Sequence, residues 1–147
     1  MTFGEEIENE IKEFINKIGN IHYHSDSNYG VEYLNNNFSF LGTKIDLSKE
    51  NNYISYDFKE NDFLDMMKFF EFKDIKEKIL ESNEIHYVGD GIIDSELVFS
   101  GKEFFKVLEF LFVNIPEHHY FFDIDKKWCL FIATEGWIDY GEKSIKE

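Results

Sequence analysis

Apolar residues recur every three or four positions over the first eighteen residues of the chain. Such spacing places them on one side of an α-helix and predicts a helix packed against a core. Thr2 and Glu5 stand at capping-box spacing at its start, and Gly19 is placed to end it. The apolar positions of this helix are Phe3, Ile7, Ile11, Phe14, Ile15 and Ile18.

Between residues 21 and 58 the pattern changes to short aromatic and β-branched runs. Residues of these types favour strands, and polar Asn clusters between them favour turns. The turns fall at Asn35–Asn37 and at Asn51–Asn52. We therefore predict four strands, in IHYH, NYGVEYL, FSFLG and YISYDF.

Residues 61 to 115 return mainly to helical periodicity. The segment DFLDMMKFFEF, capped by Asn61 or Asp62, is apolar nearly all round, which predicts a helix buried on more than one side. A more amphipathic helix follows in KDIKEKILESN, and then two strands, EIHYVG and GIIDSELVF, meet at a turn over 89–91. Ser100 and Glu103 form a second capping box, which opens a helix that Pro116 ends.

The segment from His118 to Tyr140 predicts three strands, over 118–122, 128–133 and 137–140. Both faces of the middle strand are apolar, so this strand is expected at the centre of the sheet and covered on both sides. The whole pattern predicts one α+β domain over residues 1–147. We expect a mostly antiparallel sheet of about six strands, packed with three to four helices.

The net charge of the chain limits the kinds of partner that it can be expected to bind. The chain carries 30 acidic residues against 15 basic ones, a net charge of −15, and is 18% aromatic, too aromatic for a disordered acidic tail. Binding to nucleic acid or to an anionic membrane needs clustered basic residues, so neither is expected as a partner. A basic protein is the partner that this charge favours. The single cysteine excludes an internal disulfide, and no signal peptide or membrane-spanning run is visible, so a cytoplasmic location is expected.

Four groups of residues are candidates for chemistry. His22 and His24 share one face of a predicted strand and, with His86, His118 or His119 nearby, have the ligand types of a zinc site. A simple alternative is that they are half-exposed strand histidines, and no zinc-binding motif supports a metal.

Asp123 and Asp125 form a D-x-D pair of the kind that chelates a divalent cation, although aspartates between two strands are more typical of a turn. Cys129, with His118 or His119 as base, has the elements of a nucleophile, but its central strand favours an inert, buried thiol. The carboxylates Glu135 and Asp139 are no more diagnostic, because chance pairs are certain among so many acids. We predict no catalytic residue, no metal and no cofactor.

Two surfaces are predicted to bind a partner. In the last strand, Trp137 and Asp139 alternate with Ile138 and Tyr140, so an inward Ile138 leaves Trp137 facing outward among carboxylates. We expect Trp137→Ala to cost about 2 kcal/mol of binding without affecting folding, whereas a Trp137 in the core would make folding fail. The residues of the first surface are Asp123, Asp125, Glu135, Trp137, Asp139 and Tyr140, and those of the second are Asp26, Tyr29 and Glu32.

The segment Pro116 to Gly141 resembles small bacterial proteins, with its aromatic strand, acidic turn, Trp128-Cys129-Leu130, Thr134-Glu135-Gly136 and closing strand. Several of these are similar to immunity proteins of bacterial polymorphic or contact-dependent toxin systems. The resemblance implies a non-enzymatic cytosolic protein that binds and neutralises a cognate toxin. The alternatives are a small His–carboxylate or metal-dependent enzyme using His22, His24, His118 and His119, and a module that binds a ligand in an aromatic pocket.

Overall fold

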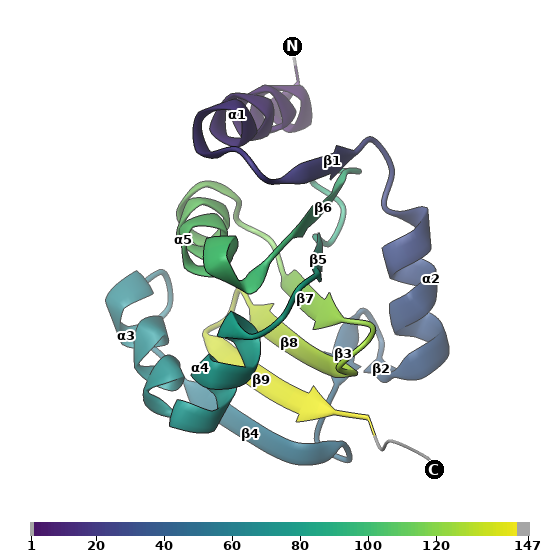
Figure 1. Cartoon of the computed structure of the whole chain (residues 1–147), viewed down its shortest axis with the longest axis vertical. Helices are drawn as coiled ribbons and strands as arrows, with labels where there is room; N and C mark the ends of the chain where they lie inside the picture. Colours follow the sequence, from purple (N-terminus) through teal and green to yellow (C-terminus); the bar gives the residue numbers. More distant parts are fainter. Residues whose placement is uncertain (1, 144–147) are drawn as a thin grey trace.

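The central feature of the fold is an antiparallel sheet in the order β1-β6-β5-β7-β8-β9-β4 (Figure 1). The computed structural model describes residues 2–143. The strands of this sheet are β1 (His22–His24), β4 (Asn51–Asp57), β5 (Ile85–Val88), β6 (Glu96–Phe99), β7 (His119–Asp123), β8 (Trp128–Ala133) and β9 (Trp137–Glu142). A separate hairpin joins β2 (Ser39–Leu41) and β3 (Lys44–Asp46). The predicted α+β class is confirmed, with a main sheet of seven strands where about six were expected.

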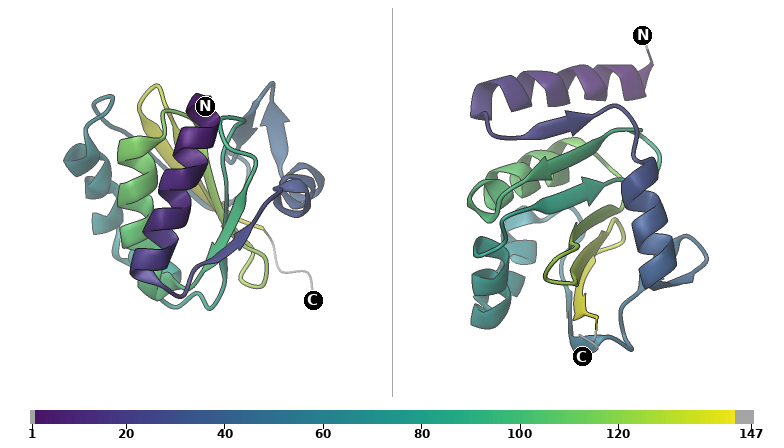
Figure 2. Two further views of the ribbon diagram at one scale, coloured as in Figure 1. Left: turned by 90° about the horizontal axis from the view of Figure 1, so that it is seen from above. Right: turned by 45° about the vertical axis from the view of Figure 1, so that its right-hand side comes forward.

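One face of the sheet is covered by helices (Figure 2). They are α1 (Phe3–Ile18), α3 (Phe63–Met67), the 3₁₀ helix η1 (Lys68–Glu71), α4 (Lys73–Leu80), the 3₁₀ helix η2 (Gly101–Glu103) and α5 (Phe104–Asn114). Their apolar sides form the larger core with one side of the strands, so that Ile11, Phe69 and Leu108 meet Phe121 and Leu130. The start of α1 is as expected, because the Glu5 N–H donates to Thr2 Oγ1 at 3.1 Å. None of the helices within residues 2–143 is long and apolar enough to cross a lipid bilayer.

The other face is covered by α2 (Asn28–Asn37) and the β2–β3 hairpin (Figure 2). The prediction of a strand in NYGVEYL is therefore wrong. Gly30 and Leu34, four residues apart, are the buried positions of this helix and rest against the sheet. The contacts with the sheet decide the local structure here, over the strand preference of the aromatic and β-branched residues.

The second capping box is also not formed. Ser100 makes no side-chain capping bond, and the chain enters α5 through η2 instead. Gly101 lies so close to α4 that an added Cβ would stand 2.2 Å from the Ile79 carbonyl oxygen, and its N–H donates to the Ser82 carbonyl at 2.8 Å. Packing against α4 thus fixes the start of this helical segment.

Two further predictions differ from the structure, one in the burial of a helix and one in the length of a turn. The helix predicted to be buried on more than one side leaves Leu64 78% exposed. Between β5 and β6 the tight turn expected over 89–91 is a longer connection over 89–95. The prediction for β8 is confirmed, because all six of its residues are buried between β7 and β9.

Candidate functional site

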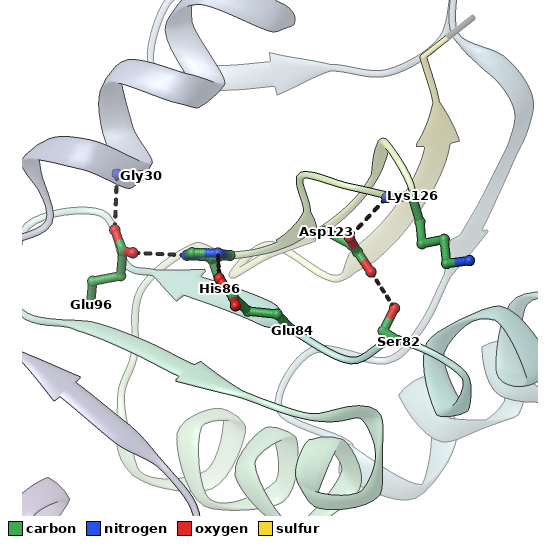
Figure 3. Close-up of polar contacts among 7 residues, drawn as sticks. All are labelled: Gly30, Ser82, Glu84, His86, Glu96, Asp123 and Lys126. Atoms are coloured by element: carbon green, nitrogen blue, oxygen red, sulfur yellow. Dashed lines mark hydrogen bonds and ion pairs between the residues drawn. The ribbon is translucent and has the colours of Figure 1, made fainter. Parts of the chain in front are cut away.

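The first predicted surface is largely internal. Asp123 is 2% exposed; its Oδ2 accepts from Ser82 Oγ at 2.6 Å and its Oδ1 from the Lys126 N–H at 2.9 Å (Figure 3). The alternative of turn chemistry for the D-x-D pair is therefore correct for Asp123, while Asp125 remains on the exterior. Asp123 joins the β7–β8 turn to the end of α4 and is not available to a partner.

Asp139 and Tyr140 are also buried, which corrects their assignment to an interface. Asp139 is 8% exposed and accepts a hydrogen bond from the Ser55 hydroxyl on β4. Burial, partly offset by that bond, raises the pKa of its carboxyl. Tyr140 is fully buried in the larger core, and its hydroxyl donates to Glu142. The alternation along β9 was read correctly, but both faces of the strand are covered.

Trp137 is half-buried, and so is neither the outward-facing anchor nor the core residue that the sequence allows. Its ring packs on the smaller core beside Phe131, with ring centroids 6.5 Å apart. Lys44 of β3 lies over the ring and forms an ion pair with Glu135. Hydrogen bonds from Lys44 and Thr134 lower the pKa of Glu135 to about 2. A lysine of the chain itself thus occupies the place predicted for a partner's cation.

The second predicted surface is exposed throughout. Asp26, Tyr29 and Glu32 lie at or near the start of α2, and Tyr29 is 65% exposed. Asp26 Oδ1 accepts from the Asn28 N–H at 3.1 Å, a local bond of the kind that often begins a helix. A partner can therefore reach all three of these residues, as it can the exterior Asp125.

Tyr29 and Asp26 stand at a cleft between α2 and the β1 edge of the sheet, with a volume of about 480 Å³. We call it the histidine cleft. The pairing of three strands builds its floor. Val98 of β6 lies between His22 of β1 and His86 of β5. Next to them, His24 of β1 is paired with Glu96 of β6. The residues lining it are His22, His24, Asp26, Tyr29, Glu84, His86, Glu96 and Val98.

His86 lies between two carboxylates in this cleft (Figure 3). Its Nδ1 is 2.9 Å from Glu96 Oε2 and its Nε2 is 2.9 Å from Glu84 Oε1. Burial alone would lower the pKa of His86, but the hydrogen bonds and charges of Glu96 and Glu84 outweigh it and raise the pKa. When the ring is protonated, both nitrogens donate to these carboxylates, and the imidazolium has no free lone pair with which to act as a base.

Glu96 also holds α2 in place. The Gly30 N–H donates to Glu96 Oε1 at 2.9 Å, a buried bond that leaves no room for a side chain at residue 30 (Figure 3). An added Cβ would stand 2.3 Å from Glu96 Oε1 and 2.9 Å from Val88 Cγ1. The start of α2 and the cleft beside it are thus fixed by a charged side chain of β6.

Aromatic contacts complete the anchoring of α2. Tyr29 and Tyr33, one helical turn apart, meet His86 and Phe122, which are paired across β5 and β7. The Tyr33 and Phe122 rings stack at 5.2 Å, and the His86 and Phe122 rings stack at the same centroid distance. This column leaves Tyr29 at its outer end, where the ring is open to solvent.

The candidate histidines do not converge on one site. His118 Nδ1 accepts from the Thr134 N–H at 3.1 Å, and His119 Nδ1 is hydrogen-bonded to the Tyr87 hydroxyl at 2.6 Å, both at the start of β7 and away from β1. Burial lowers the pKa of His119 to about 3, so its ring is neutral. The arrangement of His22, His24, His118 and His119 in one cleft, which the enzyme alternative requires, is not present.

A second cavity, of about 220 Å³, lies where α5 ends beside β7 and β8. Phe58 and Phe112 provide aromatic walls of the type that the ligand-binding alternative requires. Two of its ionisable groups are engaged within the fold, since Glu117 accepts from the N–H groups of Asp90 and Ile92 and His119 is bonded to Tyr87. Burial raises the pKa of Glu117 to about 7, although these two N–H bonds act in the opposite direction.

Neither nucleophilic nor metal chemistry is assembled in the described part of the chain. Cys129 is fully buried on β8, and burial raises the pKa of its thiol well above the usual range, as the inert alternative requires. Within residues 2–143 no three His, Cys, Asp or Glu side chains are grouped closely enough to hold a metal ion.

Comparison of the chain with protein families, with curated proteins and with solved structures yields no match. The function must therefore be argued from the geometry of the cleft.

Sequence reasoning missed Glu84 and Glu96 altogether. The spacing of His22 and His24 predicts that both lie on one face of a strand, with His86 as one possible neighbour, and all three do line the cleft. Placing Glu96 opposite His24, however, requires knowing that β6 pairs with β1.

Proposed function

We propose that this chain is an acidic protein-binding domain that binds a basic protein and neutralises it by covering its active surface. A toxin domain, the partner that the resemblance of residues 116–141 to immunity proteins implies, fits this role. The proposal does not require catalysis by the chain. The exposed position of Tyr29 at the mouth of an acidic cleft is the observation that carries it.

Electrostatics support association with a basic partner. A net charge of −15 attracts a cationic protein over long distances and can raise the association rate by roughly 10–10³-fold at low salt. Binding energy at protein interfaces comes mainly from a few aromatic or arginine anchors surrounded by polar groups. Tyr29, with Asp26, Glu32 and Glu84 around it, has the composition of such an anchor.

The proposal is tested by capturing partners with a tagged copy of the chain at low and high salt, followed by mass spectrometry. We expect one dominant basic protein, retained at low salt and weakened at high salt. The association rate of the purified pair should fall steeply with ionic strength, and the partner's own activity should be lost in the complex. No specific protein at either salt, or association that is insensitive to salt, would refute the proposal.

A further inference from the structure

Charge in the histidine cleft is negative even with His86 protonated. Asp26, Glu84 and Glu96 contribute three negative charges against the one positive charge of the imidazolium. Glu96 is 3% exposed and satisfied within the fold, whereas the Glu84 side chain is 61% exposed. Two carboxylates, Glu84 and Asp26, are therefore available at the mouth of the cleft to a cation from outside.

Elsewhere in the molecule, similar pairs of a ring and a carboxylate are filled by lysines of the chain. Lys44 lies over Trp137 and pairs with Glu135, and Lys78 lies over Tyr140 and pairs with Glu142. Lys143 is placed in the same way on Phe38 and Glu50, 5.5 Å from the ring centroid.

Among residues 2–143, no lysine lines the histidine cleft, and His86 on its floor is already held between two carboxylates. At three other places a lysine of the chain lies over an aromatic ring and pairs with a carboxylate. At Tyr29 the ring and the carboxylates are present, but no lysine of the described residues lies between them.

We propose that the histidine cleft receives an arginine side chain of the basic partner, with its guanidinium stacked on Tyr29 and hydrogen-bonded to Glu84 and Asp26. This inference rests on the proposed function. Arginine suits the site better than lysine because its planar group stacks on aromatic rings and binds carboxylates through two parallel hydrogen bonds. The volume of about 480 Å³ lies within the range of natural ligand sites and holds such a side chain together with some flanking backbone.

The direct test is an NMR titration of the ¹⁵N-labelled chain with acetyl-arginine methylamide. Matched titrations use acetyl-lysine methylamide and the uncharged acetyl-norleucine methylamide. We expect the arginine probe to shift the amide signals of β1, the start of α2 and Glu84, more strongly than the lysine probe, with no response to norleucine. Equal responses to arginine and lysine, or shifts spread over the acidic exterior of α1, would overturn the assignment.

Variants locate the contact. Glu84→Gln and Asp26→Asn should each weaken binding of the arginine probe about tenfold, the usual effect of losing a charged hydrogen-bond partner. Tyr29→Ala should weaken it and Tyr29→Phe should not, because the ring and not the hydroxyl provides the stacking surface. Glu13→Gln, an exposed acid on α1, is the matched control and should leave binding unchanged. A preserved amide spectrum verifies that each variant is folded, and an effect of Glu84→Gln no larger than that of Glu13→Gln refutes the site.

The two proposals can fail separately. If a basic partner is captured but Glu84→Gln and Tyr29→Ala bind it as well as the wild type, the arginine site is wrong and the binding function stands. If the arginine probe binds the cleft but no basic protein is captured, the site stands and the binding function fails.

Discussion

Lys44 Nζ lies 4.9 Å from the centroid of the Trp137 ring and forms an ion pair with Glu135. Two of the residues that the sequence marks as a partner-binding surface are therefore engaged with a cation of the β2–β3 hairpin. The second predicted surface, around Tyr29, lies at the other end of the same sheet face and is exposed.

Replacing Lys44 by Met should release Glu135. Because hydrogen bonds from Lys44 and Thr134 hold the pKa of Glu135 at about 2, we expect this pKa to rise toward the ordinary value of 4.5 in Lys44→Met. An NMR titration of the Glu135 side chain measures the change. Lys106→Met, an exposed lysine on α5, is the control, and an unchanged pKa in Lys44→Met would mean that the ion pair is not formed in solution.

Adding a methyl group at Gly30 should loosen α2. The new Cβ would overlap Glu96 Oε1 and Val88 Cγ1, so we expect Gly30→Ala to lower the free energy of unfolding by about 1–3 kcal/mol. Urea denaturation provides the measurement. The control is Asn36→Ala on the exposed side of α2, expected within about 0.5 kcal/mol of the wild type; equal stabilities of the two variants would argue against close packing at residue 30.

Removing the charge of Glu96 should lower the free energy of unfolding by an amount that depends on pH. Since the folded-state pKa of His86 is raised above 6.5, its ion pairs stabilise the fold fully below pH 6.5 and less as the pH rises through the folded-state value. Glu96→Gln should therefore lower the pKa of His86 and destabilise the fold by about 3 kcal/mol at pH 6, with a smaller loss at pH 9. Unfolding curves at several pH values and the His86 ring signals test this, with His118 as an internal reference. A loss that is constant with pH would exclude a charged His86.

Glu117 should give a pH dependence of stability opposite to that of an acid whose pKa is lowered by folding. Its folded-state pKa is about 7 against 4.5 for the free side chain, so the folded state binds the extra proton and stability falls as the pH rises from 4.5 to 7. In Glu117→Gln this fall should be absent, which unfolding measurements across that range detect. Glu135→Gln serves as the control, because Glu135 is ionised in the folded state throughout the same range. Parallel curves for the wild type and Glu117→Gln would contradict the raised pKa.

Local patterns were sufficient for most elements of this fold. The spacing of apolar residues placed α1, α4 and α5, and the two apolar faces of residues 128–133 placed β8 at the centre of the sheet. These features depend on neighbours in sequence, which is the information that periodicity contains. The same reasoning failed at α2, where the residues favour a strand but contacts with Glu96 and Phe122 hold a helix.

Only some residues of the candidate site could be predicted from the sequence, for a similar reason. Asp26, Tyr29 and Glu32 were identified as an acidic and aromatic group, and their exposure fits that prediction. The burial of Asp123 and Asp139 was not foreseen, because alternation shows which face a residue occupies but not whether another element covers that face. Glu84 and Glu96 reach the cleft because β6 pairs with β1 on one side and with β5 on the other, and strand order is not contained in local spacing.

The strand order also bears on how the chain is made. β7, β8 and β9, at residues 119–142, lie in the interior of the sheet, whereas β1 and β4, made much earlier, lie at its two edges. During translation the segment 51–57 therefore waits for its only ladder partner, β9, until some eighty residues later have left the ribosome. Distant pairings of this kind slow folding, so the edge strands in the first half of the nascent chain stay unpaired until the later strands are made.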